Sequence, residues 1–257
     1  MKTVTVVHCW SAPRSRSTAL LYSFEARGEN ECVAIDEPLY RDWLIFKGDT
    51  VARPYHRELV EGIPPAGSPP EEADVWKREL ESLDGRIHDA VKNKLVTDDG
   101  GVVFCKHMAK HSFLYNFDKE CTVEGVNIVH RHLLLIRDPV SVLASWGAAG
   151  GVHGNNPTSD EVGIVPLLSI YSKLESRVAA GQDSLSSTSS VVILDSDDLV
   201  ADPGKPDLRT NCRTPAAIPS SLNSHTFPLN VVFSHYPRQR VPWKIFVPPY
   251  QLNMCHQ

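Results

Sequence analysis

The chain has 257 residues, of which 42% are hydrophobic and 22% are charged, so it is long enough to bury the core of one domain. Its net charge of -5 at pH 7 and its sequence pI near 6.1 argue against nucleic-acid or membrane-surface binding, because phosphates are met by an excess of Lys and Arg. Any anion site must therefore be local, and we expect a small-molecule partner.

The cysteines show neither a CxxC pair nor dense spacing, so the sequence predicts neither a zinc module nor a disulfide scaffold. Reduced thiols fit a cytosolic setting. No run of about 18 apolar residues occurs, which would be needed for a membrane-spanning helix. We therefore expect a cytoplasmic protein. The cysteines are Cys9, Cys32, Cys105, Cys121, Cys212 and Cys255.

In the first half of the chain, apolar strands alternate with amphipathic helices. The pattern predicts a βα unit first, then a second strand and helix, a Pro/Gly/Ser loop, a polar surface helix and a third strand. The strands are expected at 3–10, 32–35 and 102–106, the helices at 17–28, 36–48 and 71–95, and the loop at 64–70.

The second half continues the alternation. The unbroken apolar run at 132–136 is typical of a parallel strand covered on both faces. It is followed by a helix at 140–146, a Gly/Asn loop at 147–157, a long helix at 161–180 and a strand at 191–194. This order predicts an α/β domain with a three-layer parallel sheet over residues 1–212. Residues 213–257 keep neither period and form an atypical tail, disordered or altered by splicing.

The segment "PRSRST", residues 13–18, lies between the first strand and its helix, where an open α/β sheet binds anions. It lacks the glycine and lysine of GxxxxGK[ST], which disfavours a standard ATP or GTP site. Two arginines and three hydroxyls take their place. The alternative is a surface turn with an N-capping serine. The candidate anion-binding residues are Arg14, Ser15, Arg16, Ser17 and Thr18.

A second candidate lies in "LLLIRDPVSVLASW", residues 133–146. Arg137 leaves the strand end, where it can clamp a phosphate through two hydrogen bonds, and Pro139 starts a helix that brings Ser145 to the same side. The alternative is that Arg137 pairs with Asp138 or caps a helix.

These segments resemble the sulfotransferases. "PRSRST" is similar to their 5′-phosphosulfate loop, and the segment with Arg137 and Ser145 to their 3′-phosphate motif. "VVILDSDDLVADP", residues 191–203, looks like a later strand and helix start of the same superfamily. The nearest resemblance is to the sulfotransferase-like N-terminal segment of plant branched-chain aminotransferase-like proteins. It implies a P-loop NTPase/sulfotransferase-like fold and transfer of a sulfuryl group from 3′-phosphoadenosine 5′-phosphosulfate to a small hydroxylated acceptor, without a metal.

The resemblance also suggests the residues that perform the chemistry. Arg14 stabilises charge on the transferred group, in place of the lysine of many family members. Lys106 and His107 resemble the K-x-H segment of cytosolic sulfotransferases with one residue fewer, which makes His107 one candidate base. Glu37 resembles the acceptor-facing glutamate of carbohydrate and bacterial sulfotransferases and is the other. The alternatives are a structural histidine and a helix N-terminus at residues 36–38.

The sequence also departs from the family pattern. Arg16 stands where the family commonly has glycine, and the tail lacks the late basic loop that closes over the 3′-phosphate. Two rival hypotheses remain, a P-loop kinase and a non-catalytic nucleotide-binding remnant. His130 and His132 are spaced to lie on one strand face, a geometry compatible with a metal, but no third ligand is visible in the sequence.

Overall fold

The computed structural model describes residues 2–28, 30–48, 56–61, 82–95, 101–148, 159–180 and 191–201. The predicted loop at 64–70, the domain boundary at 212 and the tail at 213–257 lie outside these residues.

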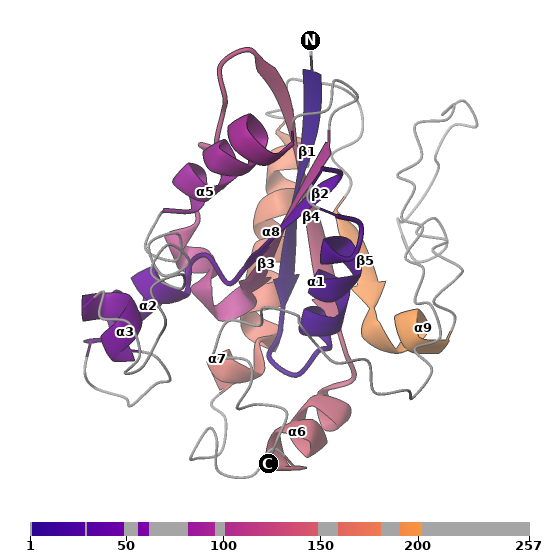
Figure 1. The fold of residues 1–257 in the computed structure, drawn as a ribbon. Helices are drawn as coiled ribbons and strands as arrows, with labels where there is room; N and C mark the ends of the chain where they lie inside the picture. Colours follow the sequence, from indigo (N-terminus) through magenta and orange to yellow (C-terminus); the bar gives the residue numbers. More distant parts are fainter. Residues whose placement is uncertain are drawn as a thin grey trace, which may run out of the picture.

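The described strands form one sheet in which every pairing is parallel. Their order is β2-β3-β1-β4-β5, so the first strand lies in the centre (Figure 1). The prediction of a parallel α/β sheet is confirmed. The strands are β1 (Lys2–Ser11), β2 (Cys32–Asp36), β3 (Gly101–Met108), β4 (Val126–Ile136) and β5 (Val192–Asp195).

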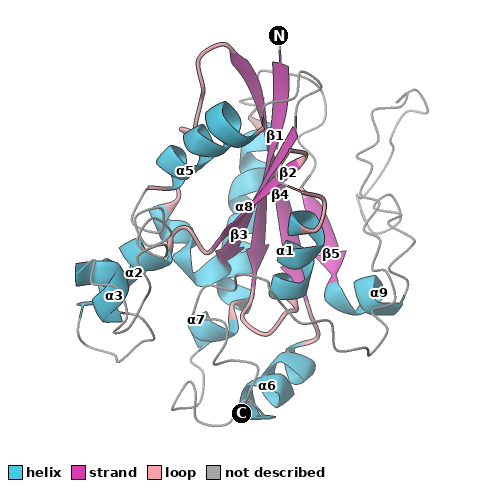
Figure 2. Cartoon of the chain, viewed as in Figure 1, coloured by secondary structure: helices cyan, strands magenta, loops and turns pink. Residues whose placement is uncertain are grey.

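Helices cover both faces of the sheet, which gives the three predicted layers (Figure 2). Helices α1 (Ser17–Glu25) and α9 (Ser196–Ala201) lie on one face, where the rings of Phe24 and Phe104 stack at 4.0 Å. Helices α5 (Leu83–Asp89) and α8 (Ile164–Ala179) cover the opposite face. Residues of each strand alternate between these two cores, because successive side chains of a strand point to opposite faces.

Further helical elements lie within the described ranges. They are α2 (Tyr40–Lys47), α3 (His56–Glu61), the π-helical turn η3 (Ala90–Lys94), the 3₁₀ helix η4 (Ala109–Leu114), α6 (Pro139–Ala148) and α7 (Ser159–Val162). None of the helices within the described ranges is long and apolar enough to cross a membrane.

Two predicted helices differ from the structure. The described part of the predicted surface helix at 71–95 buries Leu83, Ile87 and Leu95 in the core, so it is not a surface element. The predicted helix at 161–180 is interrupted at Gly163, which separates α7 from α8. Gly163 has a φ of 82°, and a Cβ there would lie 3.0 Å from the backbone of Ala12. Glycine accepts this positive φ and leaves room for Ala12 because it has no Cβ. The break brings α8 against the loop that follows β1.

The strand order indicates where a ligand site is expected at one edge of the sheet. The chain leaves β1 toward β2 and leaves β3 toward β4, so it crosses the sheet in opposite directions from two adjacent strands. In open α/β sheets, ligands bind at the carboxyl ends of the strands where the winding direction changes. The loop after β1 begins at this point.

Candidate anion-binding site at the carboxyl edge of the sheet

The loop between β1 and α1 turns sharply through two arginines in the left-handed region. Arg14 has a φ of 62° and Arg16 a φ of 66°. The Ser15 hydroxyl is buried and donates to the Ala12 carbonyl over 2.7 Å, which closes the turn. Arg16 is the N-cap of α1 and makes no side-chain capping bond. The N-capping serine considered as an alternative is therefore absent at this helix, and its first-turn N–H groups face the same loop.

Two segments far apart in the sequence meet at Arg14. Arg137, at the end of β4, donates from Nη1 to the Arg14 carbonyl over 2.8 Å. Arg14 in turn donates from Nε to the hydroxyl of Ser145 in α6 over 3.1 Å. The structure therefore brings together the two predicted phosphate-binding segments.

Asp138 caps α6, which leaves the Arg137 guanidinium directed at the loop. Its carboxylate accepts hydrogen bonds from the Ser141 N–H at 2.9 Å and the Ser141 hydroxyl at 2.8 Å. These bonds lower the pKa of Asp138 from its ordinary value. The helix thus begins where the sequence predicts, because an N-cap carboxylate satisfies N–H groups of the first turn.

The side chain of Arg16 binds α9. Its Nη1 donates to the Ser196 carbonyl over 3.1 Å and forms an ion pair with Asp197. Of the predicted loop residues, Ser15 and Ser17 are buried, and Thr18 lies next to a lysine from β3. Of the predicted anion-binding residues, Arg16 therefore binds α9 in this structure, whereas Thr18 lies beside a lysine of β3.

That lysine is Lys106, which has an exposed fraction of only 2%. Its Nζ lies 2.7 Å from Asp36 Oδ1, 3.0 Å from Glu37 Oε1 and 3.4 Å from the Thr18 hydroxyl. Burial lowers the pKa of Lys106, but the charges and hydrogen bonds of Asp36 and Glu37 outweigh burial and raise it above its ordinary value. A permanent cation therefore lies at the start of α1.

From the sequence, Lys106 is expected beside His107 at the end of its strand, but its contact with the loop is not indicated. In the sheet, Asp36 of β2 lies beside Lys106 of β3. The order of residues along the sequence does not reveal this pairing. Glu37 follows at once, with a φ of 37° and its N–H bonded to the Lys106 carbonyl over 2.9 Å. A non-glycine residue in this region is strained and must be held by its surroundings.

The two candidate bases lie on opposite faces of the sheet. Lys106 points to the α1 face with Glu37, whereas His107, the next residue, points into the core on the α8 face. His107 is fully buried, and burial, with the nearby His132 and Arg86, lowers its pKa to about 3. His107 and Glu37 therefore do not share one site in this structure.

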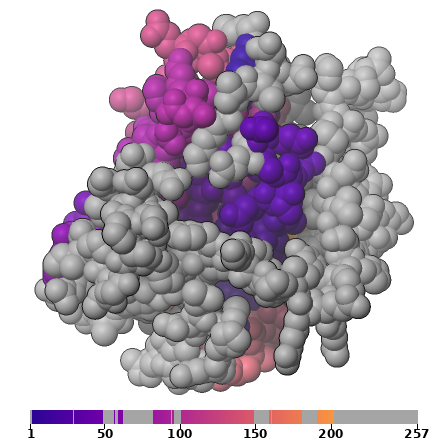
Figure 3. Space-filling model, viewed as in Figure 1, coloured from indigo at the N-terminus to yellow at the C-terminus, as the bar shows by residue number. Residues whose placement is uncertain are grey.

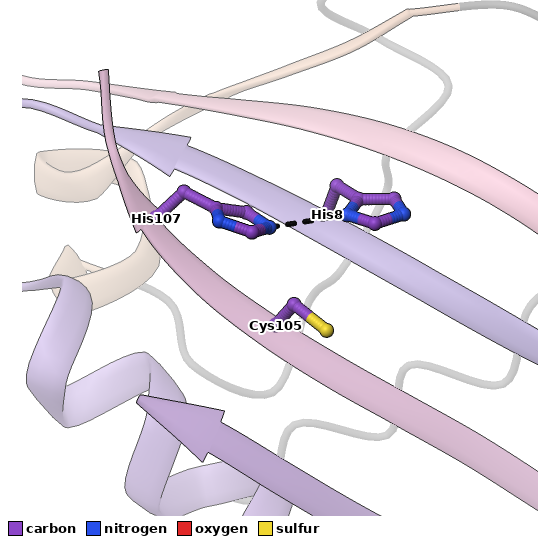
Figure 4. Close-up of side chains that lie close together, drawn as sticks. All are labelled: His8, Cys105 and His107. Atoms are coloured by element: carbon purple, nitrogen blue, oxygen red, sulfur yellow. Dashed lines mark hydrogen bonds between the residues drawn. The ribbon is translucent and has the colours of Figure 1, made fainter. Parts of the chain in front are cut away.

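His107 belongs to a layer of buried rings on the α8 face of the sheet. His107 Nε2 lies 3.1 Å from His8 Nδ1, and His8 Nε2 lies 2.9 Å from His130 Nδ1. His132 accepts at Nδ1 from the Trp10 N–H over 3.1 Å. His130 and His132 thus share a strand face as predicted, and each is hydrogen-bonded there. Figure 4 shows the thiol of Cys105 beside His8 and His107.

On the α1 side of the molecule, part of the N-terminal segment reaches the surface (Figure 3). At the carboxyl edge of the sheet, hydrogen bonds connect Arg14, Arg137 and Lys106 to the β1–α1 loop or to the first turn of α1. Arg14 and Arg137 supply positive charge at this helix N-terminus, whereas Asp36 and Glu37 offset the charge of Lys106. The loop therefore suits an anionic ligand.

Comparison with known proteins gives two curated relatives in plants, and no family model matches the chain. Branched-chain-amino-acid aminotransferase-like protein 2 of Arabidopsis thaliana is 36% identical over 170 residues, which cover 66% of this chain and 24% of that protein. Branched-chain-amino-acid aminotransferase-like protein 1 of the same plant is 33% identical over 171 residues, with the same coverage. The chain therefore has homologues among plant branched-chain aminotransferase-like proteins, and it spans about a quarter of their length.

Proposed function

We propose that the chain binds 3′-phosphoadenosine 5′-phosphosulfate at the β1–α1 loop and transfers its sulfuryl group to a small hydroxylated acceptor. The observation that carries the proposal is the convergence of Arg14, Arg137 and Ser145 on this loop. A nucleotide with phosphates on both its 3′ and 5′ sides needs two adjacent anion sites, and the two segments predicted to bind phosphate are in contact here.

The two ends of the nucleotide would bind different parts of the cluster. Residues 14–18 and the first N–H groups of α1 bind the 5′-phosphosulfate, since a helix N-terminus favours negative charge. Arg137 and Ser145 bind the 3′-phosphate. The hydrogen bond between Ser145 and Arg14 ties the two parts together.

In the reaction, the bond between sulfur and the bridging phosphate oxygen breaks as the acceptor oxygen bonds to sulfur. The products are the sulfated acceptor and adenosine 3′,5′-bisphosphate, and the acceptor proton passes to a base. Arg14 and Lys106 stabilise the charge that develops on the leaving phosphate and the transferred group.

Glu37 is the base that this arrangement favours. It lies on the same side of the sheet as Lys106 and Thr18, and 27% of its side chain is exposed. Movement of Lys106 toward a bound phosphosulfate would release the Glu37 carboxylate to accept the acceptor proton. His107 is the alternative base, and it requires the acceptor to enter the buried ring layer.

Calorimetry with adenosine 3′,5′-bisphosphate, AMP and ATP tests the proposal. The bisphosphate should bind much more tightly than AMP, and chelation of divalent ions with EDTA should leave this binding unchanged. Arg27→Ala, at the far end of α1, is the control that should leave both affinities unchanged. Equal affinities for the bisphosphate and AMP would overturn the proposal.

Two activity assays separate the rival functions. Magnesium-dependent turnover of ATP would assign the site to a P-loop kinase. Tight bisphosphate binding without transfer to any of a panel of phenols, alcohols and sugars would leave a non-catalytic nucleotide-binding protein.

A further inference from the structure

The buried face of the sheet opposite α1 carries three potential metal ligands from two neighbouring strands. Parallel pairing places His8 of β1 directly beside Cys105 of β3, and His107 lies two residues further along the same face of β3. One donor atom from each residue lies within 4.8 Å of the others (Figure 4). All three residues are fully buried, and Cys105 is a free thiol.

Hydrogen bonds around His8 direct a lone pair toward this cluster. His130 Nε2 lies 2.8 Å from the Cys121 carbonyl, which can only accept, so this nitrogen carries the hydrogen. In the neutral ring, His130 Nδ1 then accepts from His8 Nε2 over 2.9 Å. His8 Nδ1 is therefore the unprotonated nitrogen. Metal-bound histidines have this arrangement, in which the second ring N–H donates to an outer group that fixes the tautomer.

His107 and His8 are in contact through one nitrogen of each ring. Its Nε2 lies 3.1 Å from His8 Nδ1, while its Nδ1 is buried and has no hydrogen-bond partner among the described residues. An ion between the two rings would replace this hydrogen bond with two metal–nitrogen bonds, and the hydrogen on His107 Nε2 would move to Nδ1 of the same ring. The 3.1 Å separation is close to the roughly 3.3 Å between two nitrogens that each bind one tetrahedral ion at about 2.0 Å.

We propose that His8, Cys105 and His107 bind one thiophilic metal ion of the Cu⁺ or Zn²⁺ class. A thiolate with two imidazoles selects soft and borderline ions over Mg²⁺ and Ca²⁺, which need oxygen ligands. On binding, the Cys105 S–H bond is replaced by a sulfur–metal bond and the proton passes to solvent. Three donors are the number that trigonal Cu⁺ takes, whereas Zn²⁺ usually takes a fourth ligand. The site stiffens the centre of the sheet and is separate from the β1–α1 loop.

Metal titration of the purified chain tests this site. The protein is stripped of metal under reducing conditions and titrated without oxygen with Cu⁺ and, in a separate series, with Zn²⁺, each in competition with a chromophoric chelator. One equivalent should bind to each chain, and Cys105→Ala should weaken binding by more than about 100-fold. Cys9→Ala is the matched control, because Cys9 is equally buried but belongs to the opposite face of the sheet.

A measurement on the wild-type chain keeps the test valid if a variant does not fold. X-ray absorption of the loaded protein should show one sulfur at about 2.3 Å and two imidazole nitrogens at about 2.0 Å. Failure of both ions to bind, or an oxygen-only coordination shell, would overturn the proposal. So would unchanged affinity in folded Cys105→Ala. Each of these outcomes leaves bisphosphate binding unaffected, so the metal site and the proposed function fail separately.

Discussion

Arg137 donates a hydrogen bond from its Nη1 atom to the backbone carbonyl of Arg14 over 2.8 Å, which joins the end of β4 to the loop after β1. The two residues are 123 positions apart in the chain. Arg14 is held in the left-handed region, where a residue other than glycine requires support from its surroundings. One guanidinium therefore both supports the loop and faces the proposed phosphate site.

Replacement of Arg137 should reduce the preference for nucleotides that carry a 3′-phosphate. We expect Arg137→Ala to lower the affinity ratio of adenosine 3′,5′-bisphosphate to AMP by about 10 to 150-fold, because a charge-assisted contact with two hydrogen bonds is lost. AMP affinity should fall only slightly, through the lost support of Arg14. Calorimetry measures both ligands. An unchanged ratio in the folded variant would show that Arg137 is structural only.

The acceptor base should be Glu37. Glu37→Gln keeps the shape of the side chain but removes the proton acceptor, so kcat should fall by about 10² to 10⁴ with the nucleotide affinity nearly unchanged. The measurement is the initial rate of transfer to an acceptor. Asp36→Asn is the matched control. Asp36 also pairs with Lys106, but it lies within β2, whereas Glu37 follows the strand. Loss of activity in a folded His107→Asn variant, with Glu37→Gln active, would reverse the assignment.

Removal of the buried cation should destabilise the whole domain. Lys106→Met removes the cation that pairs with Asp36 and Glu37, and breaking a buried ion pair costs about 3 to 5 kcal/mol. Urea unfolding monitored by circular dichroism measures the loss. Lys92→Met is the control, since Lys92 is exposed and donates to the backbone carbonyl of Glu124, and it should change the free energy of unfolding by less than about 1 kcal/mol. Equal effects of the two variants would contradict the prediction.

Arg16 should be a site where glycine stabilises the fold. Its φ of 66° costs about 1 to 2 kcal/mol for a residue with a Cβ, whereas its half-exposed ion pair with Asp197 contributes about 1 kcal/mol or less. Arg16→Gly should therefore raise the melting temperature slightly. Arg16→Ala removes the ion pair without relieving the strain and should lower it. If Arg16→Ala and Arg16→Gly lower the melting temperature equally, the backbone at Arg16 is not strained.

The sequence by itself determined the architecture. Unbroken apolar strands alternating with amphipathic helices are compatible with a parallel sheet covered on both faces, because each strand must bury two sides. The location of the site follows from the same pattern. Residues that directly follow parallel strands meet at one edge of the sheet, so the sequence predicts that Arg14 and Arg137 lie close together.

Tertiary structure decided which side chains share a site. His107 and Lys106 are adjacent in sequence, but a strand directs them to opposite faces, and only the packing of α1 and α8 shows which face holds the anion loop. The burial of the helix at 83–94 was also decided by packing, since its apolar residues are too sparse to indicate a core position. The proximity of His8 to Cys105 depends on strand order and register. Both arise from contacts between residues about a hundred positions apart, and a local sequence pattern carries no information about such contacts.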